Sequence, residues 1–103
     1  MSALTASPDQ AQAILGQVAQ ELGVSESEAM AEGLRTLLEK NLHVVQARIF
    51  EIRGRYGVAS VEDLEDRYRQ GTLDEASSWR DLQALDHLEY RTERLQQLIS
   101  ALP

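Results

Sequence analysis

The segment Gly23-Val24-Ser25-Glu26-Ser27-Glu28 lies between two amphipathic stretches and decides how the chain folds. Gly23 suits the left-handed backbone conformation that ends a helix. Ser25 is followed three residues later by Glu28, and this spacing forms a capping box that starts a helix. These residues predict that one helix ends near Leu22 and that the next begins almost at once.

Capping signals and glycines elsewhere in the chain predict four helices in total. Ser7, Pro8 and Gln10 predict the start of the first helix, because they combine a capping box with proline at the first helical position. Helical spacing of apolar residues supports each element. The first helix is expected from Pro8 to Leu22, and the second from about Glu26 to about Arg53, where Gly54 and Gly57 end it. The third is expected from Ser60 to Gly71, and the fourth from about Trp79 to Leu102, capped by Ser77 or Ser78.

The long second helix carries an apolar stripe that predicts its buried face. Steps of three and four residues keep the stripe on one side of a helix. Its members are Leu34, Leu38, Leu42, Val45, Ile49, Ile52 and Tyr56. No run alternates with the period of a strand, and Met1 to Ala6 is the only candidate. The predicted fold class is therefore all-α, a helical hairpin with two long helices and two shorter ones.

We expect a single helical domain over residues 1–103, with a helix pair at 7–41 and a hairpin at 42–103 that forms the partner-binding half. A second helix of about 28 residues would be about 42 Å long, which one protomer cannot cover on all sides. A second stripe on that helix predicts a dimer surface at His43, Ala47 and Phe50, continuing to Gly54. The expected assembly is a homodimer whose long helices form a bundle.

Composition excludes several function classes. The net charge of −7 disfavours broad contact with nucleic acid or anionic membranes and favours a basic partner. The absence of cysteine excludes disulfides, thiolate metal sites and cysteine nucleophiles. We expect no signal peptide, no membrane span and a cytoplasmic location. Lys40 is the only lysine beside nine arginines, which is typical of a GC-rich and thus prokaryotic genome.

No catalytic or cofactor constellation is present, and no enzyme activity is predicted. A helical dimetal site needs Glu-x-x-His pairs, but Lys40 and Ala84 occupy the glutamate positions before His43 and His87. Glu39 lies one turn before His43, where a surface ion pair is favoured over a metal site. We therefore expect neither a metal nor a cofactor.

Two charged neighbourhoods are candidate binding sites. The first is an acidic docking patch for a basic partner, formed by Glu62, Asp63, Glu65 and Asp66 with Trp79. Its alternative interpretation is that these acids suit a helix N-terminus and that Trp79 fills the core. The second is a candidate nucleic-acid contact formed by Arg48, Arg53 and Arg55. Here ion pairs such as Glu51 with Arg55 are the favoured alternative.

Residues from about Ser7 to Asn41 resemble the two-helix part of ribbon–helix–helix proteins, a family that includes many bacterial antitoxins. The resemblance is carried by the apolar first helix, the turn quoted above and the residues Ala29, Met30, Gly33, Leu34 and Leu37. The DNA-reading strand of that family would precede the first helix, where Thr5 is the only side chain of the usual base-reading kind. The resemblance therefore implies an antitoxin-like helix pair without its DNA-reading residues.

Three functions follow as hypotheses. The first is an antitoxin-like protein whose acidic half sequesters a small basic protein, such as a nuclease toxin. The second is a self-contained structural or regulatory homodimer. The third is a transcriptional regulator that contacts DNA through the arginines near residues 48–55, although nucleic acid is not expected to bind to this acidic chain by itself.

Overall fold

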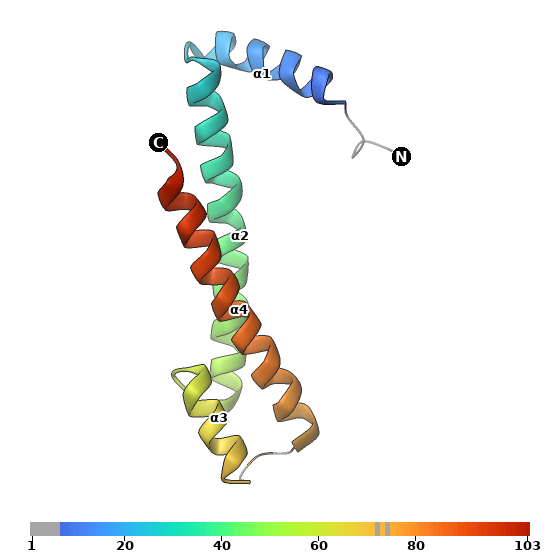
Figure 1. Cartoon of the computed structure of the whole chain (residues 1–103), viewed down its shortest axis with the longest axis vertical. Coiled ribbons are helices and arrows are strands. Elements are labelled where there is room, and N and C mark those ends of the chain that lie inside the picture. Colours follow the sequence, from blue (N-terminus) through green and yellow to red (C-terminus); the bar gives the residue numbers. More distant parts are fainter. Residues whose placement is uncertain (1–6, 72, 74) are drawn as a thin grey trace. The chain divides into compact units, whose positions relative to one another are not determined.

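The computed structural model describes residues 7–71, 73 and 75–103, which form four helices (Figure 1). They are α1 (Pro8–Leu22), α2 (Glu26–Tyr56), α3 (Val61–Arg69) and α4 (Glu75–Ala101). None of these described residues forms a strand. The all-α class is thereby confirmed, with two long and two shorter helices. The candidate strand at Met1 to Ala6, including Thr5, lies outside the described residues.

The junction between α1 and α2 confirms the prediction made from its sequence. Gly23 has a φ of 70° and ends α1, and the Val24 amide donates to the carbonyl of Ala19 over 3.0 Å. Ser25 and Glu28 then form the reciprocal capping box, with amide-to-side-chain distances of 3.2 and 3.0 Å. Only Gly23, Val24 and the cap Ser25 lie between the two helices.

Helix α2 ends later than we predicted from Gly54. The helix runs through Gly54 to Tyr56 and ends at Gly57, which has a φ of 64°. The amide of Val58 donates to the carbonyl of Arg53 over 3.0 Å, the bond that closes a Schellman motif. A glycine ends a helix only when it adopts the left-handed conformation, and of the two glycines Gly57 alone does so.

Helix α4 begins earlier than we predicted, at Glu75 and not at Trp79. Ser77 and Ser78 lie inside the helix, so the prediction that one of them caps it is wrong. Ser78 is 1% exposed and faces the interior of the hairpin. A buried serine within the first turns of a helix has the same sequence signature as a capping serine, which explains the error.

The chain divides into two compact units. The hairpin unit, Leu38–Ala101, contains the second part of α2, all of α3 and α4. Within it α4 runs back along α2 in the opposite direction, with α3 between their connected ends (Figure 1). Its core is one apolar cluster to which all three helices contribute: Val45, Ile49, Ile52, Val58, Val61, Leu64, Leu82, Leu85 and Leu95. This unit therefore has the means to fold without a partner.

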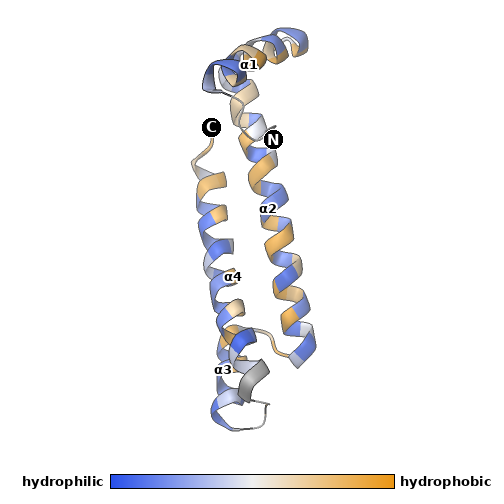
Figure 2. Cartoon of the chain, turned by 90° about the vertical axis from the view of Figure 1, so that its right-hand side faces the viewer, coloured by the Kyte–Doolittle hydropathy of each residue, from blue (hydrophilic) through white to orange (hydrophobic). Residues whose placement is uncertain are grey.

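The N-terminal unit, which consists of the chain up to Leu37 together with Leu102–Pro103, has a very different interior. Ala19 is the only buried residue of α1. The unit is held by polar contacts such as Gln12 Nε2 to Glu26 Oε1 at 2.9 Å and Arg35 Nη2 to the Pro103 carbonyl at 3.4 Å. Apolar residues of α1 and of the start of α2 remain exposed. Figure 2 shows hydrophobic positions, in orange, along both helices. This unit is folded but has almost no core.

Candidate functional site

A continuous surface of α3 and α4 in the hairpin unit combines carboxylates with exposed aromatic rings. We call it the acidic–aromatic face and define it as Glu62 and Glu65 of α3 with Trp79, Asp86, Tyr90 and Glu93 of α4. Two shallow grooves of about 490 and 300 Å³ lie along it and share Val61 and Asp86 as lining residues. The shared residues make the two grooves one surface.

The spacing of residues along α4 explains why this face is straight. Trp79, Gln83, Asp86, Tyr90 and Glu93 follow one another by four, three, four and three residues, which places them on one side of the helix. At 1.5 Å per residue the row is about 21 Å long. Leu85 lies farther round the helix and is buried in the core, whereas Leu82 is buried next to the row and lines one of the two grooves. The core residues of α4 thus fix the direction in which the face points.

The aromatic rings of the face are accessible. Trp79 is 47% exposed and Tyr90 is 65% exposed. Trp79 also packs against Tyr68 of α3, with ring centroids 5.6 Å apart at an angle of 41°. One side of the indole is therefore supported by the protein and the rest is open to a ligand. Between the two interpretations of Trp79, this arrangement favours a surface role over a core role.

Three carboxylates of the face, Glu62, Asp86 and Glu93, are exposed and have no ion-pair partner within the part of the chain that the structure describes. Arg94 lies beyond Tyr90 and Glu93 in the next groove and bounds the face at that end. Unpaired carboxylates attract cations, and aromatic faces bind guanidinium and ammonium groups. The arrangement is suited to arginine and lysine side chains.

The acidic patch that we predicted on α3 is divided by the structure. Glu62 and Glu65 belong to the acidic–aromatic face, although Glu65 pairs with Arg69. Asp66 also faces Arg69, at 3.4 Å. Asp63 accepts a hydrogen bond from the amide of Ala59 over 3.3 Å at the start of the helix. Asp63 therefore supports the helix N-terminus, as the alternative interpretation proposed.

The candidate nucleic-acid arginines make contacts inside the hairpin unit. Arg55 pairs with Asp81 at 2.7 Å and with Glu51 at 3.6 Å, so the i,i+4 pair that we favoured is confirmed. Arg53 pairs with Glu89 at 2.7 Å. Arg48 is exposed and helps to lower the pKa of Asp81 by charge. Two of the three positive charges are thus partly neutralised by α4.

Asp81 is the centre of a small polar network that joins the end of α2 to α4. Its Oδ2 accepts hydrogen bonds from the Tyr56 hydroxyl at 2.5 Å and from Arg55 at 2.7 Å. Burial acts to raise the pKa of Asp81, but these hydrogen bonds and the charge of Arg55 outweigh it and lower the pKa. Burial and the bond to Asp81 raise the pKa of Tyr56. The network has a structural role, because it links the last turn of α2 to α4.

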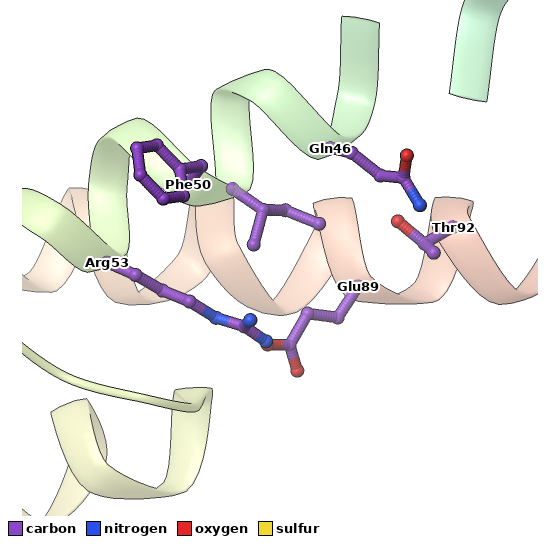
Figure 3. A pocket seen from close by; sticks show the side chains of 6 residues that line it. Gln46, Phe50, Arg53, Glu89 and Thr92 are labelled. Carbon is purple, nitrogen blue, oxygen red and sulfur yellow. The ribbon is translucent and has the colours of Figure 1, made fainter. Parts of the chain in front are cut away.

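Arg53 and Glu89 lie in a depression of about 290 Å³ between α2 and α4, also lined by Gln46, Ile49, Phe50 and Thr92. Figure 3 shows the Arg53 side chain reaching toward Glu89 and the Gln46 and Thr92 side chains facing each other across the gap. Arg53 Nε is buried and has no hydrogen-bond partner among the described residues. The Arg53–Glu89 ion pair lines this depression and links α2 to α4.

The predicted dimer stripe lies on the outer side of α2. His43, Ala47 and Phe50 are all exposed, and Phe50 is 80% exposed. Phe50 is the only large apolar residue of this stripe. The structure places the three residues on one open face, and self-association through them stays a prediction.

A single family model extends across both units of the chain. The chain belongs to the Uncharacterized protein MJ0235 family. The family model matches residues 10–103, so it covers all of α2, α3 and α4 and most of α1. No curated protein and no solved structure matches the chain.

The described residues hold no group of three or more histidine, aspartate and glutamate side chains suited to a metal ion. His43 and His87 lie on different helices, each exposed. Among the described helices, none combines the length and the apolar character needed to cross a membrane.

Sequence reasoning missed Asp86, Tyr90 and Glu93 as members of one face. The available signal was the repeat of four and three residues from Trp79 to Glu93, which places two aromatic and two acidic side chains in one row. That row becomes a groove only because α3 packs beside it, and this contact is tertiary.

Proposed function

We propose that this protein is a non-enzymatic, antitoxin-like binding protein that captures a small basic protein on its acidic–aromatic face. The observation that carries the proposal is the row of exposed aromatic and unpaired acidic side chains along α4, beside Glu62 of α3. Aromatic residues dominate the energetics of protein interfaces, and complementary charge speeds and directs association. A partner that presents arginine and lysine would satisfy both features.

Other properties of the chain support the proposal. The net charge of −7 favours a basic partner over nucleic acid. The helix pair at residues 7–41 resembles the corresponding part of antitoxins that inhibit small toxins, some of them nucleases. DNA-binding regulation has less support, because Arg53 and Arg55 already pair with Glu89 and Asp81.

A fluorescence titration tests the face directly, because Trp79 is the only tryptophan of the chain. We expect an arginine-rich peptide to change the emission of Trp79, and the same peptide with glutamine in place of arginine to leave it unchanged. Glu93→Lys should weaken the interaction by about tenfold or more, because it reverses a charge inside the face. Glu39→Lys makes the same change of net charge on α2, away from the face, and should have a much smaller effect.

The native partner is sought by affinity capture from the host with mass spectrometry. The expected product is one small protein of high pI in a fixed ratio to the bait. It should be retained by the Glu39→Lys variant and lost by the Glu93→Lys variant. Equal titration curves for the two variants, or a captured protein that is acidic, would argue against the proposal.

A further inference from the structure

The N-terminal unit exposes two apolar stripes of nearly equal length. On α1 the stripe is Ile14, Val18 and Leu22, and on the start of α2 it is Met30, Leu34 and Leu37. The six side chains are between 42% and 65% exposed. At 1.5 Å per residue the stripes are about 12 and about 10.5 Å long. Each stripe turns through less than a quarter of the helix circumference, so each is a narrow ridge.

All six side chains of the stripes are exposed in the part of the chain that the structure describes. The only buried residue of α1 is Ala19, and Leu34 and Leu37 of α2 are 43% and 55% exposed. A pair of helices of this length needs tertiary contacts to be stable in water. Exposed apolar patches on soluble proteins often mark interfaces.

We propose that a second copy of this chain covers both stripes, in a two-fold symmetric pairing in which α1 of each protomer packs on the start of α2 of the other. A two-fold interface uses the same surface of both copies. The α1 stripe of each copy would therefore meet the α2 stripe of the other, and the two stripes are matched in length. The short branched side chains of Ile14 and Val18 would oppose the longer Met30 and Leu34. This inference does not depend on the acidic–aromatic face, with which it shares no residue.

The exposed area reaches the lower limit for a stable dimer when all six side chains are covered completely. The six side chains together expose about half of their surface, which over two copies amounts to roughly 1,200 Å², the lower limit of stable interfaces. The stripe of the predicted dimer surface at His43, Ala47 and Phe50 contains a single large apolar residue. Apolar area therefore favours the N-terminal unit as the site of self-association.

The position of Gly33 agrees with a close helix–helix contact. Gly33 lies inside α2 beside the stripe, has an ordinary helical backbone, and no atom lies within 4 Å of an added Cβ. Glycine inside a helix is unfavourable relative to alanine. No described residue of the protomer packs where a side chain at Gly33 would lie, whereas a helix from a second copy would pack closely there.

Disulfide trapping tests the proposed pairing, because the chain has no cysteine of its own. Full-length Val18→Cys and Leu34→Cys variants are prepared separately and oxidised alone and as a mixture. The proposal expects a covalent dimer from the mixture and little from either variant alone, since Cα atoms must approach to about 4.4–6.8 Å. Phe50→Cys serves as the control and should stay uncrosslinked. Efficient crosslinking of Val18→Cys by itself would overturn the reciprocal arrangement.

Light scattering and sedimentation at micromolar concentration test whether the dimer exists without crosslinking. Val18→Glu should raise the dissociation constant by about 100-fold, because it would bury an unpaired charge. Gln20→Glu adds the same charge to the other side of α1 and should leave association nearly unchanged. Phe50→Glu should also leave it unchanged. A monomeric wild-type protein, or a dimer lost in Phe50→Glu and retained in Val18→Glu, would overturn the proposal.

The salt dependence of association separates a second copy from a basic occupant of the same stripes. Residues 1–37 contain five acids, Asp9, Glu21, Glu26, Glu28 and Glu32, against Arg35, which gives −4. Two such units repel each other, so added salt should strengthen the dimer. Association that weakens as salt is added would contradict pairing between two acidic surfaces.

Discussion

At the scale of single residues, Asp81 shows how a polar group on a helical hairpin acquires a structural role. Its carboxylate accepts bonds from Tyr56 and Arg55, both at the last turn of α2, so it joins the end of one helix to the first part of another. The Asp81 side chain is 18% exposed, and its bonds to Arg55 and Tyr56 are short. A charged and partly buried pair of this kind contributes more than the exposed pairs of α3.

The lowered pKa of Asp81 has a consequence for acid stability. Because the folded state holds the pKa below the unfolded value of about 3.9, the stabilisation is complete above that value and is lost as pH falls through the folded pKa. Asp81→Asn should lower the free energy of unfolding at pH 7 by about 1.5 kcal/mol. The difference from the wild type should shrink below about pH 4. Urea unfolding at several pH values measures both quantities.

Glu39→Gln is the matched control for that experiment, because it removes an exposed carboxylate elsewhere in the hairpin unit. Its free energy of unfolding should stay within about 0.5 kcal/mol of the wild type. If the free energies of unfolding of Asp81→Asn and the wild type differ by the same amount from pH 7 to pH 3, the charge of Asp81 does not contribute to stability.

At the scale of elements, two glycines near the end of α2 give opposite predictions for the same substitution. Gly54 is helical and Gly57 has a φ of 64°, and an added Cβ would meet no atom within 4 Å at either position. Gly54→Ala should raise the free energy of unfolding by about 0.5–1 kcal/mol through helix propensity. Gly57→Ala should lower it by about 1 kcal/mol or more, because alanine disfavours the left-handed conformation.

Thermal unfolding followed by circular dichroism compares these two variants with the wild type. The order of melting temperatures should be Gly54→Ala above wild type above Gly57→Ala. Equal effects at the two positions would mean that backbone conformation does not decide where α2 ends.

The four helices were predictable from the sequence because their ends are encoded locally. The caps at Ser7, Ser25 and Ser60 and the turn at Gly23 depend on residues within four positions, and each was found where expected. The errors at Gly54 and at Ser77 and Ser78 arose where a residue type allows two local structures. Tertiary packing chooses between them, as the burial of Ser78 illustrates.

The candidate site was less predictable than the helices for a related reason. Trp79, Glu62 and Glu65 were named from the sequence, but the groove between α3 and α4 depends on how Val61, Leu64 and Leu82 pack. The internal pairs of Arg53 and Arg55 with α4 join residues more than twenty positions apart. Side chains that meet only through tertiary contact leave no short-range signal in one sequence.

At the scale of the whole molecule, the two units differ in where their stability comes from. Of the ten buried apolar residues in the described part of the chain, nine lie in the hairpin unit and the tenth is Ala19 of α1. Burial of apolar surface is the dominant favourable contribution to folding. The hairpin unit can therefore be stable as a monomer, whereas the N-terminal unit depends on what covers its stripes.

This difference predicts that hydrogen exchange will depend on protein concentration in one unit alone. Amides of α1 should become more protected as concentration rises through the dissociation constant of the dimer, because binding adds to the stability of the covered helices. Amides of α3 and of the hairpin part of α4 should exchange at rates independent of concentration. In Val18→Glu, α1 should exchange rapidly at every concentration. Protection of α1 that is already complete in a dilute monomer would show that this unit needs no second copy, and the stripes would then be free for a different partner.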